Sequence, residues 1–263
     1  MSILRAPTRA LQNRHHKKIE CDTGLTPIGE TDPADIFIVG YPKSGNTWMQ
    51  NLIAGVVYNL DPEYLTDSQI LDLVPDVHSC CHYRRHQTPM YFKTHRLPRP
   101  EYQRVIYLLR DGRDVMVSYY HHLRALNGDN VDFSEIVGTG RHLSPSKWHD
   151  HVNAWRSNPF GAEILTARYE DLLENPVSEL RRVCEFAGIQ RSTELLETVS
   201  RKSSFSKMRE KEEKTGWENP QWPSSRSFVR RGEAGSFKDE MPADVLSVFM
   251  AQAGETLRAC NYL

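Results

Sequence analysis

The most constraining feature of this chain is the stretch from Ile36 to Trp48, which reads IFIVGYPKSGNTW. It begins with a short apolar, β-branched run, which indicates a strand buried on both faces. Gly40 and Gly45 bound the loop that follows, and from Trp48 onward apolar residues recur at helical spacing as far as Leu60. A buried strand, a glycine-bounded loop and a helix in immediate succession indicate one unit of a parallel α/β sheet.

Strand-like and helix-like segments alternate through the rest of the chain. The predicted strands are 35–40, 90–95, 104–110 and 162–170, and helical periodicity covers 48–60, 112–120, 176–187, 192–200 and 243–259. Because strands that are apolar throughout need cover on both faces, we predict one α/β domain over 34–263 with a central parallel sheet flanked by helices. Segment 206–236 combines glycines, prolines and charges without periodicity, and is predicted to be a mobile cover.

Residues 1–33 are predicted to be a mobile basic segment, because the first 19 residues carry five Lys or Arg and no acid. They lack the apolar core of a secretory signal, while an organelle transit peptide stays open. The chain has 33 basic and 34 acidic residues, which argues against a nucleic-acid partner bound by bulk charge. No apolar run reaches the roughly 18 residues of a membrane span, so we expect no membrane insertion and a cytoplasmic location.

The five cysteines give no clear disulfide or metal pattern. Their number is odd and no pair has the CxxC spacing of a zinc site. Cys80 and Cys81 lie near His78 and His82, but adjacent ligands of this kind rarely close a tetrahedral site. No metal site is therefore predicted.

The loop between Gly40 and Gly45 is predicted to bind an anion, because loop and helix-start N–H groups converge there and the helix dipole favours negative charge. The two glycines have the spacing of a nucleotide-binding P-loop, which needs Lys and then Ser or Thr directly after the second glycine. Here Asn46 and Thr47 hold those positions, and Lys43 lies inside the loop instead. The position of the lysine therefore indicates an anion other than that of a standard P-loop.

Five parts of the chain, in the same order, resemble the cytosolic sulfotransferases. These are YPKSGNTW (41–48), KTHRLP (93–98), LLRDGRDVMVSYYHH (108–122), ARYEDLLENP (167–176), and SSFSKM (203–208) followed by FVRRGEAGSFK (228–238). The joint occurrence is specific and spans about 36–238. The resemblance implies the sulfotransferase fold, the donor 3′-phosphoadenosine 5′-phosphosulfate (PAPS), the desulfated product PAP, and no metal.

The resemblance also implies which residues bind the donor. Lys43 and the loop would hold the 5′-phosphosulfate end, and Arg110 and Ser118 would grip the 3′-phosphate. Arg110 ends a buried strand and Ser118 lies about two turns into the next helix, so two elements can pinch one phosphate. Gly232 is expected to let the backbone approach that phosphate closely. Adenine would stack between Trp48 and Phe205. The full donor-binding set is Lys43, Ser44, Gly45, Asn46, Thr47, Trp48, Arg110, Ser118, Tyr169, Ser203, Phe205, Arg230, Arg231 and Gly232.

The predicted reaction is in-line transfer of the sulfuryl group to a hydroxyl or amine of a small-molecule acceptor. His95 matches the family's catalytic histidine, and an imidazole of unperturbed pKa about 6.5 suits a general base near neutral pH. Strand alternation puts Lys93 on the same face as His95. Lys43 and Lys93 are predicted to stabilise the charge that develops on the sulfuryl and leaving oxygens. His121 and His122, on a predicted helix, are given no role.

Two other functions stay open. One is a noncatalytic protein that binds PAPS or PAP; the other is a P-loop nucleotide phosphotransferase, which would need recognisable Mg²⁺-holding carboxylates and a lysine after the second glycine. Segment 75–89 is rich in His and Arg where the family has apolar groups, and it predicts a polar acceptor. Pro242 and Ala243 replace the Thr and Val of the family's dimer-forming stretch, so that dimer is not expected.

Overall fold

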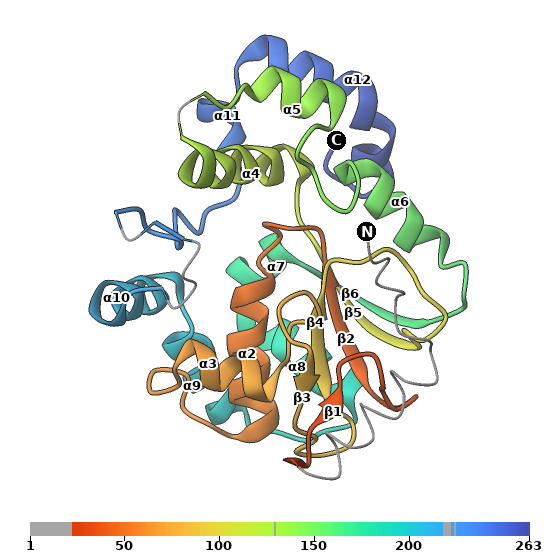
Figure 1. Ribbon diagram of the computed structural model, residues 1–263, viewed down its shortest axis with the longest axis vertical. Coiled ribbons are helices and arrows are strands. Elements are labelled where there is room, and N and C mark those ends of the chain that lie inside the picture. Colours follow the sequence, from red (N-terminus) through yellow and green to blue (C-terminus); the bar gives the residue numbers. More distant parts are fainter. Residues whose placement is uncertain (1–22, 129, 218–221, 224) are drawn as a thin grey trace, which may run out of the picture.

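A four-stranded parallel sheet forms the centre of the computed structural model, which describes residues 23–128, 130–217, 222–223 and 225–263. The strand order is β4-β2-β5-β6 (Figure 1), and every neighbouring pair is parallel. The strands are β2 Ile36–Gly40, β4 Tyr91–Thr94, β5 Arg104–Leu109 and β6 Glu163–Arg168. The predicted α/β fold with a central parallel sheet is confirmed.

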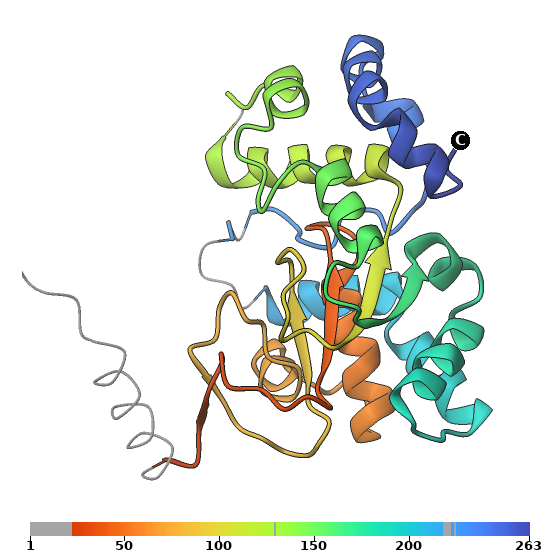
Figure 2. The same ribbon diagram turned by 90° about the vertical axis from the view of Figure 1, so that its right-hand side faces the viewer.

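Helices cover both faces of the sheet, because alternate side chains of each strand enter two separate cores. Phe37 and Val39 of β2 join the core under α4 Gly112–Asn127, α5 Phe133–Thr139, α6 Trp148–Ser157 and α12 Ala243–Ala259. Ile36 and Ile38 join the core under α2 Asn46–Tyr58, α8 Pro176–Ala187 and α9 Thr193–Lys202. Figures 1 and 2 show these two groups of helices on opposite sides of the sheet.

Shorter elements complete the domain. They are α3 Asp67–Leu73, α7 Tyr169–Glu174, α10 Phe205–Thr215, α11 Phe237–Glu240, and an antiparallel pair of β1 Thr26–Pro27 with β3 His82–Tyr83. The part of the predicted basic segment that lies within 1–22 is outside the described residues. Within the described ranges, no helix combines the length and the apolar composition that a membrane span requires.

The prediction that 206–236 is an irregular cover is wrong for its first third, where α10 forms a regular helix. No residue of α10 is buried. The helix is supported by surface ion pairs at helical spacing, from Lys207 to Glu210 at 2.8 Å and from Arg209 to Glu213 at 3.3 Å. Because α10 has no buried apolar face, the hydrophobic pattern gave no signal for it.

Candidate active site

The loop after β2 has the backbone shape of an anion-binding turn. Lys43 and Gly45 both have positive φ, 73° and 94°. A Cβ atom at Gly45 would lie 2.8 Å from the Tyr169 ring, so the position requires glycine on steric grounds as well. Gly45 is also the N-cap of α2, and no side chain caps the first N–H groups of that helix. These N–H groups therefore point to where a ligand anion would lie.

Buried polar atoms without a hydrogen-bond partner gather around this loop. Among the described residues they include Ser44 Oγ, Asn46 Oδ1, Trp48 Nε1, Arg110 Nε and Ser203 Oγ. Each such atom costs roughly 1–3 kcal/mol when it stays unpaired, so native proteins rarely concentrate them without a reason. All five belong to the predicted donor-binding set, and they fit a polar, anionic ligand.

Lys43 lines a cavity of about 320 Å³. The other lining residues are Ser118, His121, His122, Ala125, Arg209, Trp222, Arg226, Ser227, Phe228 and Arg230. The Lys43 ammonium lies 4.4 Å from the centroid of the Phe228 ring. Burial, reinforced by the charges of Arg110, Lys93 and Arg230, lowers the pKa of Lys43 from 10.5 to about 7. A bound anion would raise this pKa again and restore the full positive charge.

The guanidinium of Arg110 donates hydrogen bonds to two backbone carbonyls. Its Nη1 donates to the Lys43 carbonyl at 2.9 Å and its Nη2 donates to the Glu233 carbonyl at 3.0 Å. Ser118 lines the cavity with Lys43 and Arg230, whereas Arg110 is not among the described residues that line it. Two backbone carbonyls accept from Nη1 and Nη2 of Arg110, while its Nε has no partner among the described residues, so the pinch of one phosphate between Arg110 and Ser118 stays a prediction.

The residues predicted to contact adenine lie in two groups. Trp48 meets the edge of Tyr169, with ring centroids 5.7 Å apart. Phe205 packs instead against Gly232, where an added Cβ would lie only 2.2 Å from the Phe205 ring. Gly232, with φ of 67°, is thus required for contact with the Phe205 ring, and its close approach to a phosphate stays a prediction. Stacking of adenine between Trp48 and Phe205 stays a prediction.

His95 follows β4 directly and is held at three points. Its Nδ1 lies 2.7 Å from the Gly40 carbonyl, and since a carbonyl only accepts, Nδ1 carries the proton and Nε2 keeps the lone pair. The backbone N–H of His95 donates to His78 Nε2 at 2.9 Å, and its carbonyl accepts from His151 Nε2 at 3.2 Å. Burial and the charge of Lys93 lower the pKa of His95 to about 3. The ring is therefore neutral at pH 7, as a general base must be.

Lys93 is paired with a carboxylate that the sequence pattern did not single out. Its Nζ lies 2.8 Å from Asp76 Oδ2. Asp76 Oδ1 accepts the backbone N–H of His78 at 2.9 Å, and the His78 ring stacks on His95 with centroids 5.4 Å apart. The positive charge of Lys93 still lowers the pKa of both Lys43 and His95. Asp76 therefore neutralises part of the positive charge of Lys93, and the role of Lys93 in stabilising the transition state stays a prediction.

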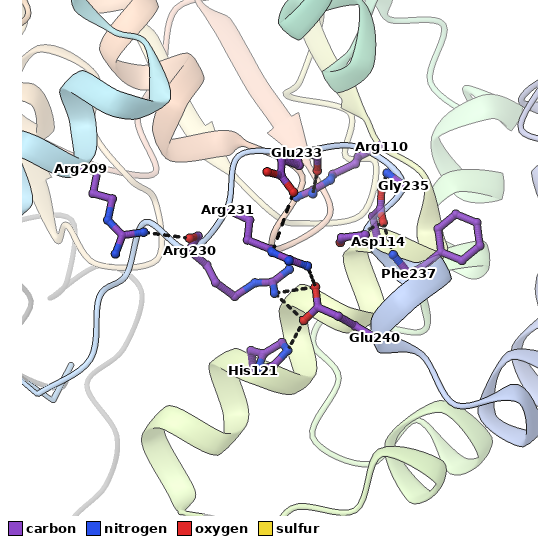
Figure 3. A network of polar contacts seen from close by, with 11 residues as sticks. Arg110, Asp114, His121, Arg209, Arg230, Arg231, Glu233, Gly235, Phe237 and Glu240 are labelled. Carbon is purple, nitrogen blue, oxygen red and sulfur yellow. Dashed lines mark hydrogen bonds and ion pairs between the residues drawn. The ribbon is translucent and has the colours of Figure 1, made fainter.

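Arg230 and Arg231 meet at the carboxylate of Glu240 in α11 (Figure 3). Arg230 Nη1 lies 2.8 and 2.6 Å from the two oxygens, Arg231 Nη1 lies 2.7 Å from Oε1, and His121 Nε2 lies 2.8 Å from Oε2. Burial opposes ionisation of Glu240, but hydrogen bonds from Arg230 and His121 and the arginine charges outweigh it and lower the pKa to about 2. Of the two arginines, only Arg230 is among the described residues that line the cavity.

Asp114 of α4 anchors the turn that leads into α11 (Figure 3). Its carboxylate accepts the N–H of Gly235 at 2.6 Å, the N–H of Phe237 at 2.9 Å and the hydroxyl of Ser236 at 3.2 Å. Asp114 is fully buried. It thereby sets where α11 presents Glu240.

A family model of the sulfotransferase domain matches residues 33–261. The chain belongs to the sulfotransferase family. This sulfotransferase is 29% identical to dog (Canis lupus familiaris) sulfotransferase 1B1 over 231 residues, which cover 79% of this chain and 78% of the relative. It is 25% identical to mouse (Mus musculus) sulfotransferase 1E1 over 251 residues, which cover 87% and 85% of the two chains.

Solved structures share the sulfotransferase fold. Retinol dehydratase, in complex with androsterone and PAP, matches with a TM-score of 0.66 at 21% identity, over 87% of this chain and 82% of that one. Mouse sulfotransferase SULT7A1, in complex with PAP, matches with a TM-score of 0.62 at 21% identity, over 87% and 86% of the two chains. At this identity the likeness shows the fold alone.

Two residues that line the cavity of this sulfotransferase, His121 and His122, were given no role from the sequence. They follow Ser118 by three and four residues on α4, and this spacing puts all three on one helix face. The other polar residues on the helix face of Ser118 could therefore have been selected together with it. No three His, Cys, Asp or Glu side chains in the described ranges are placed to share a metal ion.

Proposed function

We propose that this sulfotransferase transfers the sulfuryl group from PAPS to a hydroxyl or amine of a small-molecule acceptor. The observation that carries the proposal is the set of unpaired buried polar atoms of Ser44, Asn46, Trp48, Arg110 and Ser203, which are positions that the family pattern assigns to the donor. The two structural relatives described above are complexes with PAP, which supports the same donor. A cytoplasmic site of action is proposed as well.

The donor would be held at its two anionic ends. The loop N–H groups and Lys43 would bind the phosphosulfate, because an uncapped helix start and a lysine favour negative charge. Ser118 and Arg230 would bind the 3′-phosphate, because they line the same cavity as Lys43. Arg110 would act indirectly, by tying the loop at Lys43 to the segment at Glu233.

His95 would remove the acceptor proton. Its Nδ1 is occupied by the Gly40 carbonyl, so Nε2 has the lone pair that accepts a proton from the attacking hydroxyl or amine. As the new bond to sulfur forms, the bond from sulfur to the phosphate oxygen breaks and PAP leaves. Lys43 would stabilise the negative charge on that leaving oxygen. Asp76, paired with Lys93, would favour the imidazolium that His95 becomes.

The acceptor is proposed to be polar. Asp76 and His78 belong to segment 75–89, and both contact the catalytic positions, Asp76 through Lys93 and His78 through His95. These side chains place polar groups beside the catalytic positions, which favours an acceptor with a polar substituent. Rates with matched acceptors that differ by one polar substituent would test this, and a preference for the unsubstituted phenol would contradict it.

Binding of PAP is expected to take up a proton at alkaline pH. In the free protein Lys43 has a pKa of about 7, and a bound anion raises it toward 10.5, so above pH 7 the lysine must gain a proton as PAP binds. The affinity should therefore fall as pH rises above 7, by up to about tenfold per pH unit. Calorimetry at pH 8.5 in two buffers of different ionisation enthalpy measures the uptake directly. Equal uptake by Lys43→Met would contradict the assignment to Lys43.

The donor class is tested by calorimetric titration with PAP and, separately, with ATP and Mg²⁺. Because the loop lacks a lysine after Gly45, we expect PAP to bind the more tightly by at least about tenfold. Tighter binding of ATP with Mg²⁺ would overturn the PAPS assignment and favour the nucleotide phosphotransferase.

A further inference from the structure

The carboxylate of Glu240 lies where an arginine-bound phosphate oxygen would be expected. Both of its oxygens contact Arg230 Nη1, at 2.8 and 2.6 Å, and Arg231 adds a contact of 2.7 Å. In the part of the chain that the structure describes, Nη2 and Nε of Arg230 make no hydrogen bond. Arg230 therefore has a carboxylate on one side of its guanidinium and the cavity that holds Lys43 and Ser118 on another.

This contact is built into the fold and is more than a surface ion pair. The Glu240 side chain is 19% exposed and has a third partner in His121 on α4, at 2.8 Å. Asp114, also on α4, fixes the turn from Gly235 to Phe237 that begins α11. The carboxylate is thus presented to Arg230 by two rigid helices. An ion pair with this much support is expected to persist in solution, unlike most exposed pairs.

The backbone on the arginine side is also restrained. The Arg230 carbonyl accepts a hydrogen bond from Arg209 Nη1 at 3.3 Å, and Glu212 of α10 accepts the N–H groups of Phe228 and Val229. The backbone that carries Arg230 is therefore held in place beside Glu240. A phosphate bound at Ser118 would have to share the Arg230 guanidinium with a carboxylate.

We propose that Glu240 is an internal competitor of the donor's 3′-phosphate for Arg230, and so determines how tightly the donor and its product PAP are held. The inference rests on the proposed function, because it takes the 3′-phosphate to bind at Arg230. Two anions that share one guanidinium repel each other, and each weakens the attraction between the guanidinium and the other anion. Glu240 thus lowers the affinity for both nucleotides and speeds the release of PAP.

The test compares Glu240→Gln with Asp239→Asn, a neighbouring change of equal charge at an exposed position of the same helix. Each variant and the wild type are titrated with PAP and with AMP, which has no 3′-phosphate. Glu240→Gln keeps an oxygen that accepts from an arginine but loses the negative charge. We expect its Kd for PAP to fall about fivefold to tenfold and its Kd for AMP to change less than about twofold. Asp239→Asn should change neither Kd by more than about twofold.

An unchanged or weaker affinity of Glu240→Gln for PAP would overturn the proposal, as would an equal gain for AMP. Wild type that binds PAP no better than AMP would instead reject the 3′-phosphate site, and with it the proposed function. Stopped-flow release of PAP adds an independent measurement, with slower release from Glu240→Gln than from wild type. If Glu240→Gln does not fold, Glu240→Asp keeps the charge but shortens its reach to both arginines. A smaller gain in PAP affinity is expected there, and none would contradict the proposal.

Discussion

Replacement of His95 by asparagine is expected to lower kcat for sulfuryl transfer by about 10²–10⁴-fold, the usual contribution of a positioned general base. The Asn side-chain amide can still donate to the Gly40 carbonyl, which His95 Nδ1 contacts at 2.7 Å, so the local fold should survive. What is lost is the lone pair of Nε2, the atom that would take the acceptor proton. Steady-state rates with PAPS and any accepted substrate measure the loss.

Binding of PAP provides the internal control for this variant. We expect its Kd to change less than about twofold, because His95 contributes to the transition state and not to ground-state binding of the donor. His86→Asn is a matched control, since His86 is a surface residue that pairs with Asp72 at 2.9 Å. A His95→Asn enzyme with full kcat would remove His95 from the mechanism. Equal loss of PAP binding and rate would show damage to the loop instead.

Replacement of Lys43 by methionine is expected to lower kcat/KM for PAPS by about 10²–10³-fold, the cost of losing one preorganised charge-stabilising group. Methionine keeps a long apolar stem beside Phe228, whose ring centroid lies 4.4 Å from the Lys43 ammonium. The residue at this position still has to adopt a φ of 73°, so backbone strain is similar in both proteins. The loss of kcat/KM therefore measures the contribution of the Lys43 charge.

The division of the effect between kcat and KM decides what Lys43 does. Stabilisation of the leaving oxygen predicts that kcat itself falls, whereas a binding role alone predicts a higher KM with kcat unchanged. Lys207→Met is the control, because Lys207 is a half-buried residue of α10 that pairs with Glu210 at 2.8 Å. A kcat equal to that of wild type would contradict the assigned role in catalysis.

Local patterns account for what the sequence could predict. Strand β2 is apolar throughout and β5 is apolar apart from Arg104, and α12 begins and ends at the predicted residues 243 and 259. Helix α3 was not predicted, although Thr66 and Gln69 carry the spacing of a capping box, and the structure confirms both hydrogen bonds of that box. Helix α6 was not predicted either, although Trp148, Val152 and Trp155 stand at i, i+4 and i+7, which is helical spacing.

The candidate site also has one part that the sequence pattern could predict and another part that it could not. The loop from Lys43 to Trp48 is one continuous segment, so its glycine spacing and its lysine could be found from the sequence. Asp76, Asp114 and Glu240 could not, because each acts through the folded arrangement of elements. Asp114 binds Gly235 across 121 residues, and Asp76 binds Lys93 across 17. Carboxylates placed against arginines and lysines by tertiary folding have no local spacing rule.

The most direct test of the proposed function is transfer of the sulfuryl group itself. Purified protein is incubated with PAPS and a panel of phenols, alcohols and amines, both polar and apolar, and PAP and the sulfated product are quantified by mass spectrometry. We expect PAP and sulfated acceptor in equal amounts for at least one acceptor, and formation of both slowed by about 10²–10⁴-fold in His95→Asn. Tight binding of PAP without transfer to any acceptor would contradict it and identify a noncatalytic PAP-binding protein.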